Sequence, residues 1–147
     1  MTGALHILRT AVGIESLPQL YELQRHFEHA TPSGHKSVVM TTRKRPSRCA
    51  ELLDGGSVYW IIRHRVLCRQ AILHMEDRDE PGETPATIIY LSPQIIKVQP
   101  RNKRAIQGWR YLQGWDRPKD IGPYDPKSRD DDLPDDIARA IHDIGVI

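Results

Sequence analysis

The fold is decided by residues 51–75, which read ELLDGGSVYWIIRHRVLCRQAILHM. This stretch joins the longest β-branched and aromatic run of the chain to a cluster of arginines. It is too long for one strand, because strands are usually about 5–6 residues long. We therefore predict a turn at Arg63-His64-Arg65, which separates Ser57–Ile62 from residues 66–75 and pairs them as an antiparallel hairpin. Both faces of the first strand are mostly apolar, so we expect it to be buried.

A polar pair, Arg69 and Gln70, interrupts the apolar second strand of this hairpin. Burying an arginine costs free energy unless its charge is paired. Two interpretations follow. Either Arg69 forms an ion pair with a carboxylate such as Glu51, or Arg69 and Gln70 line a pocket, and the sequence leaves both open.

Capping residues predict two helices outside the hairpin. Ser16 and Gln19 form a capping-box pattern at the start of a helix over residues 17–29, where apolar residues recur at helical spacing. Ser47 is predicted to cap a short central helix that ends at Gly55.

Alternating apolar residues predict the remaining strands, and the result is an α+β fold with a small, mostly antiparallel sheet. The 147 residues fit one domain. We assign residues 1–112 to its core and residues 113–147 to an irregular acidic arm and a C-terminal helix that pack on the same domain. The further predicted elements are strands over residues 5–12, Lys36–Thr42, Ala86–Leu91 and 96–99, one helical turn at residues 92–94, and the C-terminal helix opening at residues 132–136 and closing at Gly145.

The composition argues against several classes of protein. The apolar runs are far shorter than the roughly 20 residues that span a membrane. Cys49 and Cys68 form no Cys-x-x-Cys pair, which favours a reducing cytoplasm. Glu22, His26 and His29 are predicted to lie on a solvated helix face rather than to bind a metal, so we predict no metal and no cofactor.

The net charge of +2 conceals two strongly basic segments. Residues 35–69 carry a net charge of +6 and residues 97–112 carry +5, while the rest of the chain is acidic. If the two segments meet in the fold, their field attracts polyanions. The first segment contains Arg43, Lys44, Arg45 and Arg48, which form either a solvated loop or an anion-binding lip.

The second basic segment ends in aromatic residues. Trp109 and Tyr111 are predicted to lie on one side of an extended segment and Arg110 on the other. The two rings either stack a base or belong to the core. The binding residues predicted over the whole chain are Arg43, Lys44, Arg45, Arg48, Arg69, Gln70, Arg104, Trp109, Arg110 and Tyr111.

Three segments carry a resemblance to a known family. Residues 51–62 (ELLDGGSVYWII), 69–73 (RQAIL) and 107–112 (QGWRYL) resemble the alphaproteobacterial family known as domain of unknown function 1489. The resemblance covers nearly the whole chain. It departs from the family pattern at Arg63-His64, where a Lys-Gly turn is expected. The family has no established activity, so the resemblance implies no function.

The order of the elements also resembles that of small β-barrels of the PUA and ASCH type. This resemblance implies a barrel with an N-terminal, a short central and a C-terminal helix. Such domains often bind RNA or modified nucleosides, but a fold-level resemblance transfers neither a function nor a catalytic residue.

Our leading hypothesis is that the chain binds RNA or a nucleotide. The cluster at residues 43–48 would contact phosphates, Arg69 and Gln70 would bind a polar edge, and Trp109 or Tyr111 would stack a base.

Two alternatives belong to other classes. One is a small hydrolase for a modified nucleoside or an acidic metabolite, with a pocket around Arg69, Tyr59 and Glu51. Its nucleophile is suggested by residue type alone. The other is a non-enzymatic interaction protein that binds an acidic protein and exchanges the acidic arm, residues 116–136, between subunits. The sequence does not predict the oligomeric state. The nucleophiles suggested for the hydrolase are Ser57, Cys49 and Cys68.

Overall fold

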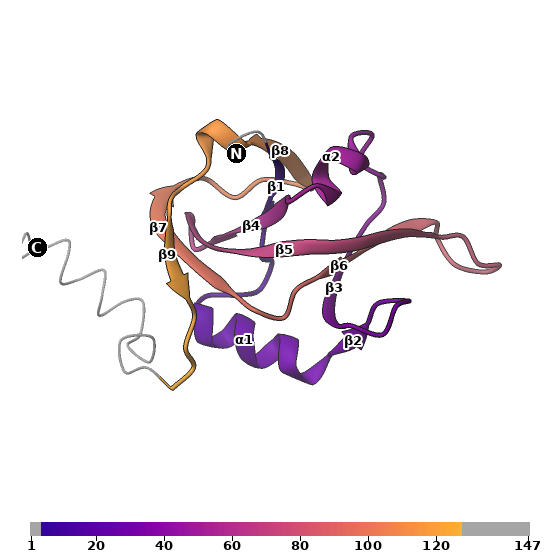
Figure 1. Cartoon of the computed structure of the whole chain (residues 1–147), viewed down its shortest axis with the longest axis horizontal. Coiled ribbons are helices and arrows are strands. Elements are labelled where there is room, and N and C mark those ends of the chain that lie inside the picture. Colours follow the sequence, from indigo (N-terminus) through magenta and orange to yellow (C-terminus); the bar gives the residue numbers. More distant parts are fainter. Residues whose placement is uncertain (1–3, 128–147) are drawn as a thin grey trace, which may run out of the picture.

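The computed structural model describes residues 4–127 as a sheet-rich α+β domain (Figure 1). Two α-helices and a short 3-10 helix accompany the strands. In chain order the elements are β1 (Leu5–Thr10), α1 (Leu17–His26), β2 (His29–Ala30), β3 (Lys36–Thr42), α2 (Cys49–Leu53), β4 (Ser57–Ile62), β5 (Arg65–Arg78), β6 (Ala86–Leu91), β7 (Ile96–Asn102), β8 (Trp109–Gln113), the 3-10 helix η1 (Gly114–Asp116) and β9 (Asp120–Pro123).

The predicted hairpin over residues 57–75 is confirmed as β4 and β5. Its turn residues Arg63 and His64 have φ values of 50° and 65°, which is the backbone of a type I′ turn. Strand β5 is 14 residues long and extends beyond the body of the molecule with β6 (Figure 1). Its first half pairs with β4 and β7, and its second half pairs with β6. One strand therefore links two curved parts of the sheet.

The sheet follows the order β2-β3-β6-β5-β4-β1-β8, with β7 and β9 beside β5. The pairing of β1 with β4 is parallel, and the other seven pairings are antiparallel. Within residues 4–127 the path does not return to its start. The mostly antiparallel α+β prediction is therefore confirmed, whereas the closed barrel is not.

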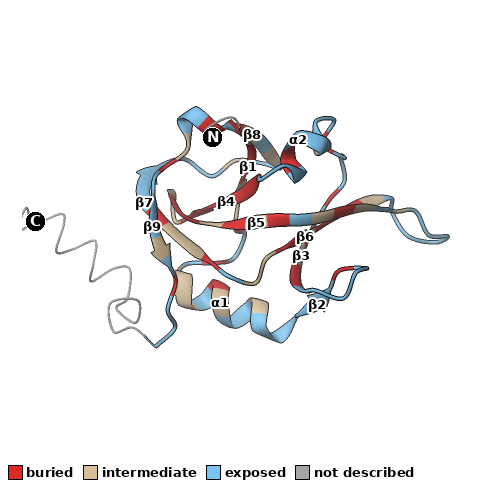
Figure 2. Ribbon diagram, viewed as in Figure 1, coloured by how far each residue is buried: buried red, intermediate tan, exposed pale blue. Residues whose placement is uncertain are grey.

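The core lies between the curved parts of the sheet, where buried residues of β1, β4, β5 and β6 gather (Figure 2). Helix α1 covers one end with Leu20, which is 4% exposed. Gly56 sits where α2 meets β1. A Cβ there would lie 2.4 Å from the backbone oxygens of Leu5 and Leu52, so only glycine fits.

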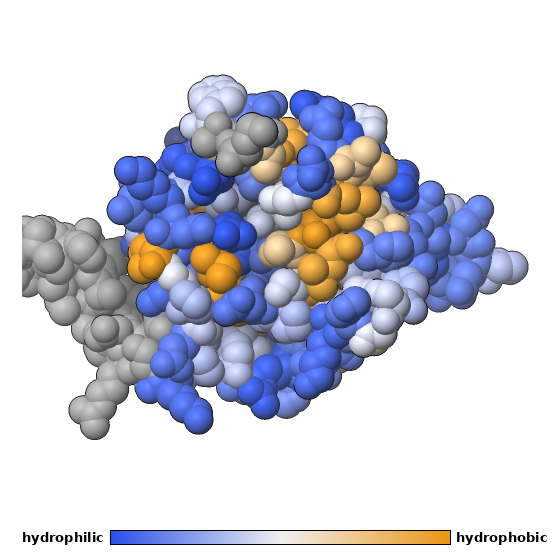
Figure 3. All heavy atoms as spheres, in the orientation of Figure 1, coloured by the Kyte–Doolittle hydropathy of each residue, from blue (hydrophilic) through white to orange (hydrophobic). Residues whose placement is uncertain are grey.

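The face of the molecule seen in Figure 3 is mostly hydrophilic, with an apolar area over β5 below α2. Leu53 of α2 and Leu73 of β5 are exposed apolar residues on these elements.

The N-terminus of α1 confirms the predicted cap. The Ser16 hydroxyl accepts a hydrogen bond from the Gln19 backbone at 3.2 Å. The Gln19 side chain reaches back to the backbone N–H of Glu15 at 2.6 Å, one residue earlier than in a standard capping box. The helix ends at His26 rather than at residue 29, because residues 29–30 pair with β3 as β2.

Other predicted boundaries differ from the structure. Ser47 does not cap α2, since its hydroxyl lies 3.4 Å from the Tyr111 hydroxyl and α2 begins after Arg48 without a side-chain cap. Residues 92–94 form a bend in which the Ser92 hydroxyl accepts from the Gln94 backbone at 3.2 Å, not a helical turn.

The arm predicted as irregular begins with ordered structure. β8 extends to Gln113, one residue past the predicted core boundary, and β9 pairs with β7. The first part of the arm is therefore part of the sheet. The predicted C-terminal helix at residues 132–145 lies outside the described residues.

Candidate nucleic-acid interface

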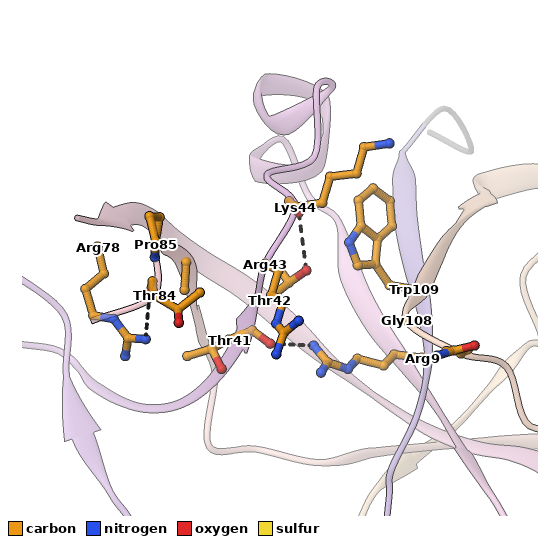
Figure 4. Close-up of a pocket in the computed structure, with 12 residues that line it drawn as sticks. Arg9, Thr41, Thr42, Arg43, Lys44, Arg78, Thr84, Pro85, Gly108 and Trp109 are labelled. Atoms are coloured by element: carbon orange, nitrogen blue, oxygen red, sulfur yellow. Dashed lines mark hydrogen bonds between the residues drawn. The ribbon is translucent and has the colours of Figure 1, made fainter. Parts of the chain in front are cut away.

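An open groove of about 710 Å³ lies where three parts of the fold meet (Figure 4). The end of β3 and the loop after it form its floor. The far end of the β5–β6 hairpin stands at one end, and β1 with the start of β8 stands at the other. We call this the basic groove. Its lining residues are Arg9, Thr41, Thr42, Arg43, Lys44, Arg78, Thr84, Pro85, Ala86, Gln107, Gly108 and Trp109.

Four cationic side chains line the basic groove, and no carboxylate is among its described lining residues. Arg43 and Lys44 are exposed, and no acidic partner within ion-pair distance is found for them in residues 4–127. Arg78 is partly neutralised, because its Nε lies 3.3 Å from Glu83 Oε2. The groove therefore presents a net positive field.

Arg9 spans the gap between two parts of the sheet. Its Nη1 donates a 2.8 Å hydrogen bond to the backbone oxygen of Thr41, a contact drawn in Figure 4. Burial lowers the pKa of the Arg9 guanidinium below its usual value, yet arginine stays charged in proteins. The bond holds a positive charge against the end of β3 in the groove wall.

The two predicted aromatic residues, Trp109 and Tyr111, pack against each other but have different neighbours. The rings of Trp109 and Tyr111 meet edge to face, with centroids 4.9 Å apart, and both pack against the core. Trp109 also lines the basic groove. Tyr111 instead lies beside Arg48, whose guanidinium carbon is 5.5 Å from the ring centroid and whose backbone N–H donates to the Tyr111 hydroxyl at 3.1 Å.

Two predicted phosphate contacts are ion-paired outside the groove. Arg45 Nη1 lies 2.7 Å from Asp77 Oδ1, and Arg48 forms a bidentate pair with Glu51. Hydrogen bonds from these arginines lower the pKa of Asp77 and of Glu51. Both pairs are exposed, so each contributes little to stability.

Both residues of the polar pair in β5, Arg69 and Gln70, form hydrogen bonds with other residues of the protein. Arg69 donates to both carboxylate oxygens of Asp120, at 2.8 and 2.7 Å, and to the Ser57 hydroxyl at 2.9 Å. Its carboxylate partner is Asp120, not Glu51. Arg69 does not line the basic groove.

Gln70 is fully buried. Its side-chain oxygen accepts from Trp60 Nε1 at 2.9 Å and from Gln24 Nε2 at 2.8 Å. Its amide nitrogen donates to Gln24 Oε1 and to the Ser92 backbone oxygen. Gln70 is thus a satisfied core residue.

Two further predicted residues are exposed outside the groove. Arg104 follows β7, and Arg110 lies opposite Leu8 in the β1–β8 ladder. Because side chains alternate along a strand, Arg110 points to the opposite face from Trp109. The structure therefore brings Arg43, Lys44 and Trp109 together and leaves the other predicted residues elsewhere.

The sequence did not single out Arg9 or Arg78 as site residues. Arg9 carried a usable signal, since it is the one charged residue in the apolar stretch of residues 5–12. Arg78 carried none, because the sequence does not show that β5 continues to that residue.

The residues suggested as nucleophiles do not form a catalytic arrangement in the described part of the chain. Ser57 and Cys68 are buried, and burial raises the pKa of the Cys68 thiol. Cys49 is half-buried and lies 3.5 Å from Arg45 Nη2. Residues 4–127 contain no cluster of three potential metal ligands. No helix in the same range has the length and apolar character needed to cross a membrane.

The chain matches the family model described as a protein of unknown function (DUF1489) over residues 7–147. The chain belongs to this family. The basic groove is therefore a feature of a DUF1489 protein, and its lining residues all fall within the matched range. No curated protein and no solved structure matches the chain.

Proposed function

We propose that the basic groove binds single-stranded RNA or a nucleotide. The observation that carries this proposal is a groove whose lining within residues 4–127 has four cationic side chains, an aromatic ring and no acidic residue. Contacts to phosphates supply nearly all of the affinity of non-specific nucleic-acid binding, and here Arg43 and Lys44 provide charges without acidic partners in the described residues.

Trp109 and the polar residues near it are suited to contact the base and the sugar of a nucleotide. An indole face stacks any base, which contributes about 1–3 kcal/mol per base. Thr41 and Thr84 line the same groove, and a threonine hydroxyl can form hydrogen bonds with phosphate or sugar oxygens. A single strand fits this arrangement better than a duplex, because stacking on a side chain needs an unpaired base.

The two alternatives receive less support. A hydrolase requires an accessible nucleophile beside a base, and Ser57 and Cys68 are buried. The first part of the acidic arm is held by its own chain, because Asp116 pairs with Arg101 and Asp120 pairs with Arg69. These pairs disfavour exchange of this part between subunits. A PUA-type or ASCH-type barrel and a cytoplasmic location stay predictions. The two free cysteines support the latter.

The test is a salt titration of binding to a fluorescently labelled, short single-stranded RNA, measured by anisotropy. Each lost phosphate contact reduces the slope of log K against log salt by about 0.7 for a single strand. We expect the Arg43→Glu, Lys44→Glu double variant to lose about 1.4 of slope and at least about tenfold in affinity at low salt.

The matched control is the Arg104→Glu, Arg110→Glu double variant, which changes the net charge equally outside the groove. It is expected to retain most of the affinity. For stacking, Trp109→Leu is compared with Trp115→Leu, because Trp115 is 78% exposed and lies outside the groove. Absence of RNA binding by the parent protein at low salt, or equal losses in both charge variants, would contradict the proposal.

A further inference from the structure

A second groove, of about 390 Å³, adjoins the basic groove. Arg9 and Thr41 line both grooves, so the hydrogen bond between them lies at the common border. The second groove lies between α1, the outer edge of β3 and the end of β1, and we call it the apolar groove. Its lining residues include Arg9, Val12, Leu23, Phe27, Val39 and Thr41.

The apolar groove exposes large side chains to solvent. Val12 is 86% exposed, Leu23 is 46% exposed and Phe27 is 62% exposed. Beyond Ser37, no described strand pairs with the outer edge of β3. A contiguous apolar surface beside an open strand edge is typical of a docking site.

The described chain ends close to the helix that forms one wall of this groove. Tyr124 is buried, and its ring lies 5.5 Å from that of Tyr21 in α1. Residues 128–147 follow, which is a length of 20 residues. Five extended residues reach about 17 Å, and a helix of 12 residues is about 18 Å long. A helix is only about 10 Å wide, so the segment is long enough to cross α1 and reach the groove.

The composition of this segment matches both grooves. At helical spacing it has the apolar residues Leu133, Ile137, Ile141 and Ile144. It also carries six aspartates and two arginines, a net charge of −4. The isoleucines are complementary to the apolar groove and the aspartates to the basic groove beside it.

We propose that residues 128–147 dock in the apolar groove of their own chain through the isoleucine face. The docked segment places aspartates next to Arg9 and the basic groove. One consequence rests on the proposed function, namely that the docked segment competes with RNA for the same positive field. The docking itself requires no RNA.

The docking is tested by NMR on the full-length chain without RNA, with labelled Ile, Leu and Val methyl groups. We expect NOEs between the methyls of Ile137 or Ile141 and those of Leu23 or Val39, at a strength independent of protein concentration. Absence of these NOEs overturns the proposal. NOEs seen only between differently labelled molecules in a mixed sample also overturn it, and assign the groove to a second copy.

A pair of matched variants provides a second measurement on the full-length chain. Ile137→Asn with Ile141→Asn removes the apolar face, whereas Ala138→Asn with His142→Asn makes the same spacing of changes on another face. Only the first is expected to shift the Leu23 and Val39 methyl signals and to tighten RNA binding at least about threefold, as release of a competing state predicts. Equal methyl shifts in both variants overturn the docking. Methyl shifts in the first variant alone, together with no RNA binding by any of the proteins, refute the proposed function and leave the docking supported.

Discussion

The buried His6 is expected to make the stability of this protein depend on pH between about 6.5 and 4, a range that lies mostly above the ordinary pKa values of carboxylates. His6 is 4% exposed, and its Nδ1 accepts the backbone N–H of Ser57 at 3.0 Å. Protonation would turn this acceptor into a donor that faces another donor. Burial, followed by the charges of Arg117 and Arg69, lowers the pKa of His6 from 6.5 to about 4, and Asp120 opposes this only in part.

The sign of the effect follows from the two pKa values. Between pH 6.5 and 4 the unfolded chain binds a proton at this histidine and the folded chain does not, so acid favours unfolding. The contribution is complete above pH 6.5 and is lost as the pH falls toward 4. With pKa values of 6.5 and about 4, the loss between pH 7 and pH 5 is about 1.8 kcal/mol, and the full loss is about 3 kcal/mol.

The assay is urea unfolding at pH 7, 6 and 5, monitored by tryptophan fluorescence. We compare the parent with His6→Asn, because the Asn side-chain oxygen can take the place of Nδ1 as acceptor and does not titrate. At pH 7 the free energy of unfolding of His6→Asn is expected to be lower than that of the parent, because the smaller side chain fills less of the core. Between pH 7 and pH 5 it is expected to change by less than about 0.5 kcal/mol.

The matched control is His64→Asn, which removes a histidine from the exposed β4–β5 turn. It is expected to follow the pH dependence of the parent. Two results would refute the reasoning: an undiminished loss of stability in His6→Asn between pH 7 and 5, or an NMR titration of His6 with a pKa near 6.5.

Three further predictions concern stability, each measured by urea unfolding. His64→Gly is expected to raise the free energy of unfolding by about 1 kcal/mol, because glycine adopts the φ of 65° without strain. An unchanged value would mean that the turn is not of type I′. Gly56→Ala is expected to lower it by more than about 2 kcal/mol through its clash with two carbonyl oxygens, whereas Gly55→Ala, at a φ of 85° in open space, costs only about 1 kcal/mol. Asp120→Asn is expected to cost about 1 kcal/mol at pH 7, because it removes the bidentate partner of Arg69. Since that pair lowers the pKa of Asp120, the parent loses the same contribution as the pH falls below 4, and a gap that persists at pH 2 would contradict the assignment.

The strands that the sequence predicted best are those with a buried face and clear ends. Lys36–Thr42, Ser57–Ile62 and Ala86–Leu91 match β3, β4 and β6, because alternation marks the face and Gly, Pro or Arg residues mark the ends. Strand β5 was predicted too short. Its last residues, from Glu76 to Arg78, pair with β6 beyond the core, where no hydrophobic pattern is needed.

Contacts between residues that are distant in sequence could not be predicted from a single sequence. The partner of Arg69 lies 51 residues away, at Asp120, and its position depends on the register of β9 against β7. Register between distant strands follows from packing rather than from local residue preferences. For the same reason Arg9 and Arg78, which come from β1 and β5, could not be placed in one groove with Arg43.

The pairing of charges, rather than their number, locates the candidate site. Arg45, Arg48 and Arg69 belong to the most basic part of the chain, yet each holds a carboxylate of the same chain. Their charges are largely cancelled at short range. Arg43 and Lys44 differ from them in having no acidic partner among the described residues, and Arg9 bonds a neutral backbone oxygen. A polyanion is drawn to charge that remains uncompensated, so the modest net charge of +2 is compatible with a strong local field at the basic groove.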